Sequence, residues 1–114
     1  MTDAVVETSI NKSPILKNIY TNLITELKQI GPLIIEPKKT SIHIKAKSAF
    51  VGIHPRKDYL IVNIVSDKPI VNNRIFKVEQ VSKTRFHNHI KIPLEQDIDR
   101  ELIGWFKQAY SLMS

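Results

Sequence analysis

YLIVNIVS, residues 59–66, is apolar on both of the sides that a β-strand would present. Side chains alternate along a strand. One side would carry Tyr59, Ile61 and Val65, and the other would carry Leu60, Val62 and Ile64. A strand that is apolar on both sides is typically central in its sheet, or its second side is covered. The segment therefore predicts a sheet in which residues 59–66 form an inner strand.

Strand patterns continue in both directions from this segment. Before it, LIIEP (33–37), SIHIKAK (41–47) and AFVGIHP (49–55) are short apolar or alternating runs. After it come the loop DKPIVNN (67–73) and the runs RIFKVEQV (74–81) and RFHNHIKI (85–92), which are joined by SKT. No helical pattern interrupts the strands, so the sheet must be mostly antiparallel.

Two amphipathic helices enclose the strands in the sequence. The first, SPILKNIYTNLITELKQIGP (13–32), has Ser13 as a cap, Pro14 in its first turn and Gly31 as a stop signal. Its apolar stripe contains Ile15, Leu16, Ile19, Tyr20, Leu23, Ile24, Leu27 and Ile30. The second, DIDRELIGWFKQAYSLMS (97–114), can be capped by Asp97 or Asp99. We therefore expect an α+β fold with two layers, in which an N-terminal and a C-terminal helix pack against a curved, mostly antiparallel sheet of about six strands.

Length and composition agree with one small domain. The chain has 114 residues, of which 42% are hydrophobic and 25% charged. We expect residues 1–12 to be a flexible tail and residues 13–114 to be a single α+β domain. The absence of cysteine excludes disulfides and thiolate chemistry. Neither a signal peptide nor an apolar stretch long enough to cross a membrane is evident, so we expect a cytoplasmic protein without a membrane partner.

The charge balance points to anionic partners. Seventeen Lys and Arg residues against eleven Asp and Glu give a net charge of +6. On the strand 85–92, the residues that alternate with the apolar side are basic, and the strand 41–47 repeats this pattern. If the two strands share one phasing, their basic sides form one face, with the turn PRKD (55–58) at its rim. The candidate polyanion-binding residues are His43, Lys45, Lys47, Arg56, Lys57, Arg85, His87, His89 and Lys91.

The same histidines raise the alternative of a metal or catalytic site. His87 and His89 could supply two ligands and His43 a third, but Arg85 and Lys91 flank the pair with positive charge. The single His-x-His lacks the hydroxyl residue of a two-histidine phosphoesterase. No glycine-rich phosphate loop or nucleophile elbow occurs. We therefore expect no metal, no cofactor and no enzymatic activity.

Three segments resemble a known family. They are KKTSIHIKAKSAFVGIHPRKDYLIVNI (38–64), VSKTRFHNHIKI (81–92) and DIDRELIGWFKQAY (97–110). They resemble a family of bacterial domains of unknown function, which also occurs at the C-terminus of longer proteins labelled predicted transport proteins. The resemblance covers residues 14–112 and implies a fold rather than an activity. More distantly, the layout is similar to the MmcQ/YjbR-like domains, for which a double-wing DNA-binding fold has been suggested.

The leading functional hypothesis is a non-catalytic binding module for nucleic acid or another polyanion. The competing hypothesis is a protein-interaction or homodimerisation domain, because one side of residues 59–66 can exceed what two helices cover. Two further interpretations stay open. The basic strand sides can simply be solvated, or a cleft between helix and sheet can hold a small ligand.

Overall fold

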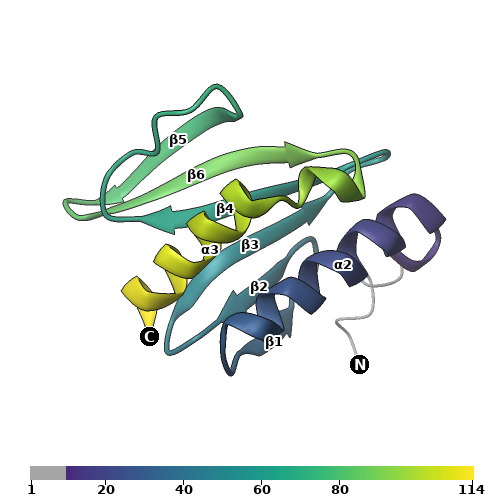
Figure 1. The fold of residues 1–114 in the computed structure, drawn as a ribbon, viewed down its shortest axis with the longest axis horizontal. Helices are drawn as coiled ribbons and strands as arrows, with labels where there is room; N and C mark the ends of the chain where they lie inside the picture. The colour runs from purple at the N-terminus through teal and green to yellow at the C-terminus, as the bar shows by residue number, and fades with distance from the viewer. Residues whose placement is uncertain (1–9) are drawn as a thin grey trace.

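One six-stranded sheet and two helices account for the computed structural model, which describes residues 10–114 (Figure 1). The elements are α2 (Pro14–Ile30), β1 (Ile34–Pro37), β2 (Ile42–Lys45), β3 (Ala49–Pro55), β4 (Leu60–Ser66), β5 (Ile75–Ser82), β6 (Arg85–Ile92), the short 3₁₀ turn η1 (Glu95–Asp97) and α3 (Arg100–Met113). The predicted α+β class, with a helix at each end of the strand succession, is confirmed.

The strand order is β1-β2-β3-β4-β6-β5, and every neighbouring pair is antiparallel. β4 lies between β3 and β6, so the doubly apolar segment is an inner strand, as predicted. After β4 the chain crosses to the sheet edge, forms β5 there, and returns as β6 between β5 and β4. The order along the chain and the order in the sheet therefore differ only for the last two strands.

The core lies between the sheet and the helices, which cover the same face (Figure 1). α3 packs on β3 and β4, and α2 packs beside it. The fully buried strand residues of this face include Ile42, Ile44, Ile53, Leu60, Val62, Ile64, Ile90 and Ile92. From the helices, Leu23, Leu27, Leu102 and Phe106 complete the layer. This burial of apolar area is the main source of stability for the fold.

Both helices begin at capping residues that were expected from the sequence. Ser13 Oγ accepts a hydrogen bond from Leu16 N at 3.3 Å, and Asp99 Oδ1 accepts one from Leu102 N at 3.1 Å. The predicted apolar stripe of α2 was wrong at its first member. Ile15 is 56% exposed, because Leu16 takes the buried position of that turn.

The N-terminal boundary of the domain also differs from the prediction. Ile10 is 1% exposed and belongs to the core, so the packed chain includes residues that were assigned to a flexible tail. The rest of that predicted tail, residues 1–9, lies outside the described residues. This single buried isoleucine extends the apolar layer next to α2. One buried residue produces no regular apolar pattern, so the sequence before α2 did not indicate its burial.

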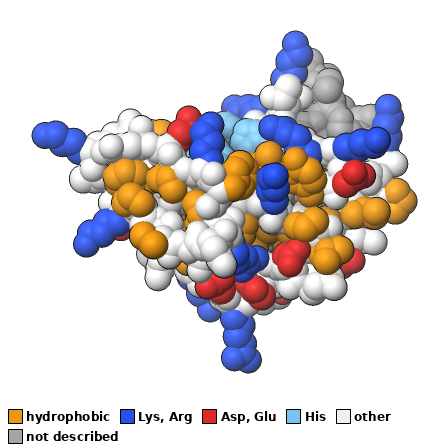
Figure 2. Space-filling model, turned by 90° about the horizontal axis from the view of Figure 1, so that it is seen from above, with side chains coloured by type: hydrophobic (Ala, Val, Ile, Leu, Met, Phe, Trp, Pro, Cys, Tyr) orange, Lys and Arg blue, Asp and Glu red, His pale blue; other side chains and the backbone are white. Residues whose placement is uncertain are grey.

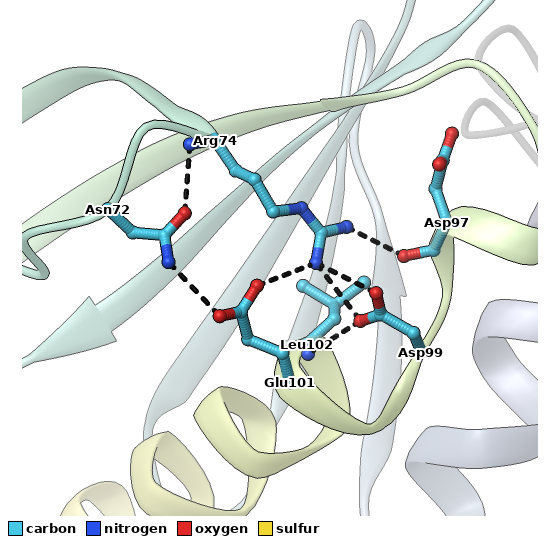
Figure 3. A network of polar contacts seen from close by, with 6 residues as sticks. All are labelled: Asn72, Arg74, Asp97, Asp99, Glu101 and Leu102. Carbon is cyan, nitrogen blue, oxygen red and sulfur yellow. Dashed lines mark hydrogen bonds and ion pairs between the residues drawn. The ribbon is translucent and has the colours of Figure 1, made fainter.

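The loop between β4 and β5 is tied to α3 by a polar network around Arg74 (Figure 3). The Arg74 guanidinium lies 3.0 Å from Asp99 Oδ1 and 3.1 Å from Glu101 Oε1, and it donates to the carbonyl of Asp97 at 2.7 Å. Asn72 Nδ2 donates to the second oxygen of Glu101 at 3.1 Å. Because Arg74 immediately precedes β5, this network fixes where the edge strand begins.

Candidate binding face of the sheet

The side of the sheet that faces away from α2 and α3 is called the open face here. The strand register places one residue from each strand in a single row across it. In sheet order the row is Glu36, His43, Gly52, Asn63, His89 and Lys77. Residues two positions away on each strand lie on the same face. The alternation of the strand residues thus collects polar side chains on the open face while the apolar ones face the helices.

All four histidines of the chain lie on the open face. His43, His87 and His89 were predicted to share it, and the register confirms this phasing for β2 and β6. His54 was missed. It lies two residues beyond Gly52 on β3, and its Nε2 is 3.5 Å from Asn63 Nδ2. Alternation along AFVGIHP was the available signal, because it places His54 on the same side as Gly52.

A shallow depression of about 60 Å³ lies among these residues. It is lined by His43, Ala49, Val51, Gly52, Asn63, Val65 and His87. Glycine suits this position, because a Cβ at Gly52 would lie 2.8 Å from Asn63 Nδ2 and the Asn63 side chain would have to shift. The missing side chain therefore leaves the space into which two imidazoles from non-adjacent strands converge.

Burial governs the protonation of His54 and His87, and one carboxylate opposes its effect on His87. Partial burial lowers the pKa of His54, and the positive charges of Arg56, His89 and His43 lower it further. Partial burial also lowers the pKa of His87, although Glu79 opposes that effect. Both side chains are therefore mainly uncharged at neutral pH in the free protein.

Glu79 pairs with His89, which lies next to the β5 end of the row. Its Oε1 lies 3.1 Å from His89 Nε2. The hydrogen bond with His89 lowers the pKa of Glu79, and the charge of Lys77 lowers it further. One acidic side chain thus sits beside the histidines, and it stays ionised through the neutral range.

Lysines flank the histidines on two sides. Lys45 Nζ lies 3.6 Å from Glu36, which also pairs with Lys38 at 3.0 Å. Across the sheet, the Lys91 ammonium lies 5.5 Å from the Tyr59 ring centre and 5.3 Å from the Phe76 ring centre. These cation–π contacts hold the Lys91 side chain over the face.

The remaining candidates lie at the two ends of the strands. Lys47 is exposed in the β2–β3 turn, whereas Arg56 and Lys57 are exposed in the β3–β4 turn at the opposite end of β3. Arg85 begins β6 and donates to the carbonyl of Thr84 at 2.7 Å. The nine predicted residues therefore do not form one tight cluster. The middle of the set contains His43, His87, His89, Lys45 and Lys91. The other four residues lie at the ends of the strands.

The exposed apolar surface of the sheet lies on its edge strands, whereas the competing hypothesis placed it on residues 59–66. On the open side of β4, Val65 is 5% exposed and Ile61 is half-buried, so this strand presents little apolar area. The large apolar side chains that are exposed on strands are Ile34 of β1 and Phe76, Val78 and Val81 of β5. Figure 2 looks onto the edge that carries β5, where hydrophobic side chains lie between lysines and arginines.

Within residues 10–114, no group of three or more histidine, aspartate or glutamate side chains is arranged to hold a metal ion. In the same residues, no helix combines the length and the apolar character needed to cross a membrane.

Comparison with known proteins gives one match. The model of a family described as Domain of unknown function (DUF5655) matches residues 6–113, and the chain therefore belongs to this family. No curated protein and no solved structure matches the chain. The expected domain of unknown function is thus confirmed, whereas the transport-protein context and the similarity to MmcQ/YjbR-like domains stay predictions.

Proposed function

We propose that this member of the DUF5655 family is a non-catalytic binding module that holds a polyanion, with nucleic acid as the leading ligand class, on the open face of its sheet. One observation carries the proposal. Basic side chains from β2, β3 and β6 lie on the face that α2 and α3 leave uncovered. A phosphate backbone is recognised by such a set of cations and donors, largely without regard to base sequence.

The balance of charge on this face supports an anionic ligand. Besides the histidines, the basic strand side chains of this face are Lys45, Lys77, Arg85 and Lys91, and the acidic ones are Glu36 and Glu79. Lys47, Arg56 and Lys57 add positive charge in the turns at both ends. The positive side chains thus follow a path along the strands, which suits an extended ligand better than a compact one.

Two of the histidines can add positive charge to this path when an anion binds. His54 and His87 are mainly neutral in the free protein, because burial lowers the pKa of each. A bound phosphate would favour their protonated forms, so binding would take up protons. Affinity is therefore expected to rise as the pH falls from about 7.5 towards 6. A cytoplasmic location, where nucleic acid is abundant, belongs to the same proposal.

The test uses fluorescence anisotropy of labelled DNA and RNA oligonucleotides over a range of salt concentrations. Lys45→Glu/Lys91→Glu places acidic groups on both flanks of the histidines. Its matched control, Lys28→Glu/Lys107→Glu, makes the same change in net charge on exposed positions of α2 and α3. We expect the open-face variant to bind more weakly than the wild type, and the slope of log K against log salt to shrink by about 2.

The control variant should retain most of the wild-type affinity, because its charges lie on the far side of the molecule. Equal loss in both double variants would mean that net charge alone drives association. Absence of wild-type binding at low salt would contradict the proposed function directly.

A further inference from the structure

β5 ends the sheet, so one row of its backbone N–H and C=O groups points away from the sheet. Phe76, Val78 and Val81 on this strand are between 42% and 53% exposed. The Arg74 network fixes the start of the strand, which makes the edge a defined surface. An ordered edge strand with exposed apolar side chains is a template for pairing with another strand.

The two edges of the sheet differ in how they are protected. β1 has four residues, ends in Pro37 and carries the ion pair of Glu36 with Lys38. Short length and proline are among the means that block edge pairing. β5 has eight residues and no proline. Its regular part, Lys77–Gln80, lies between two irregular points of the β5–β6 register.

We propose that a second copy of this chain pairs with this edge, β5 against β5 in antiparallel orientation, about a twofold axis at Val78. Lys77 of each copy then lies opposite Glu79 of the other, and the two Val78 side chains meet at the axis. Opposite charges at directly facing positions stabilise an antiparallel pair, and two such pairs form at once because of the symmetry.

The geometry of a sheet singles out this register. A twofold axis perpendicular to the sheet keeps each residue on its own face, and facing residues must lie on the same face. One residue of β5 must therefore face its own copy across the axis, and the axis cannot lie level with the middle of a peptide bond between two successive residues. An axis at Lys77 would place Lys77 against its own copy, and an axis at Glu79 would do the same for Glu79. An axis at Gln80 would face Lys77 with Lys83. Within the regular part of β5, only Val78 gives complementary charges.

The pairing has a consequence for the open face. Lys77 and Glu79 lie on that face, because they pair in register with His89 and His87. A perpendicular twofold axis would therefore place the open faces of both copies on the same side of one continuous sheet. The histidines of the two copies would flank the axis. This inference concerns self-association and stands or falls independently of polyanion binding.

The test measures the mass of the full chain by analytical ultracentrifugation over a range of protein concentrations. We expect the wild type to dimerise. Lys77→Glu alone and Glu79→Lys alone should each raise the dimer dissociation constant about tenfold or more, because each turns both ion pairs into like-charge pairs. An equimolar mixture of the two variants should dimerise again, since the two acidic side chains of the first variant then face the two lysines of the second.

Two further variants separate this edge from other surfaces. Val78→Lys should give a monomer, whereas Ile34→Lys, which changes an exposed isoleucine on the opposite edge, should leave the dimer intact. Circular dichroism melting checks that each variant is folded. A monomeric wild type at the highest soluble concentration, single reversals without effect, or a mixture that stays monomeric would each overturn the proposal.

Discussion

The side-chain oxygen of Asn88 accepts a hydrogen bond from the backbone N–H of Ile70 at 2.9 Å. Asn88 is fully buried on the helix-facing side of β6, where the pattern of Phe86, Ile90 and Ile92 favours an apolar residue. Its amide nitrogen donates to Ile64 O at 2.9 Å and to Ser66 Oγ at 2.8 Å. One polar side chain thus satisfies three groups and ties the β4–β5 loop to the sheet.

Replacement of Asn88 by leucine should therefore destabilise the domain although leucine suits an apolar core. The partly buried N–H of Ile70 and the buried carbonyl of Ile64 would each lose this partner, and a buried unsatisfied group costs about 1–3 kcal/mol. We expect a decrease of about 2–4 kcal/mol in the free energy of unfolding, measured by urea denaturation. Asn73→Leu, in the exposed part of the same loop, should change it by less than about 0.5 kcal/mol. Equal stability of the Asn88→Leu variant and the wild type would contradict this assignment.

Local sequence signals predicted the helices and strands. The features that the sequence did not predict depend on contacts between residues far apart in the chain. The signals at the ends of α2, Ser13 before Pro14 and Gly31, depend on neighbouring residues only, and their predictions are confirmed. The apolar spacing of α2 is equally local, and its prediction is confirmed except at Ile15. The phasing of β2 and β6 is equally local, since alternation decides on which side His43 and His89 lie.

The position of β5 at the edge could not be read from the sequence. The run RIFKVEQV predicts a strand, but its neighbours depend on the crossing of the chain after β4. The role of Arg74 was missed for a similar reason. Asp99 was interpreted from the sequence only as a possible helix cap, and nothing near it in the sequence indicated a guanidinium from another element.

Removal of the Arg74 guanidinium should loosen the start of β5. In Arg74→Ala, Asp99 and Glu101 lose their shared cation, and the carbonyl of Asp97 loses a donor (Figure 3). Both carboxylates are about half exposed, so solvent screening limits the cost to about 1 kcal/mol. We expect faster amide hydrogen exchange in residues 70–78 than in the wild type. Arg100→Ala, which removes an exposed arginine from the first turn of α3, is the control and should leave that exchange unchanged.

Two glycines should respond to alanine in opposite ways. At Gly52 the new methyl group would lie 2.8 Å from Asn63 Nδ2, so Asn63 must move and stability should fall by about 1 kcal/mol. At Gly104 in α3 the methyl group meets no atom within 4 Å, and helix propensity should raise stability by about 0.5–1 kcal/mol. Chemical denaturation of both variants checks the contrast.

A second change tests whether Asn63 is the cause. Asn63→Ala removes the atom that the new methyl group would approach. The cost of Gly52→Ala should therefore largely disappear in the Asn63→Ala background, as a coupling in a double-mutant cycle. Identical costs in both backgrounds would show that the backbone of β3, rather than Asn63, opposes the added methyl group.

Acidification should destabilise the free domain through the two half-buried histidines. Burial lowers the pKa of His54 and His87 below the value of about 6.5 that they take in the unfolded chain. Below that pH the unfolded state binds protons that the folded state does not, so the free energy of unfolding falls as the pH falls. We expect the urea midpoint to decrease between about pH 7.5 and 5.5.

The double variant His54→Gln/His87→Gln should lose part of this pH dependence. Glutamine keeps a polar side chain at both positions but does not titrate, and the surrounding charged groups, including Glu79, are unchanged. The difference between the urea midpoints at the two pH values should therefore be smaller in the variant than in the wild type. If the two differences were equal, the acid sensitivity would arise from other groups. The proposal that His54 and His87 take up protons when an anion binds would then lose its support.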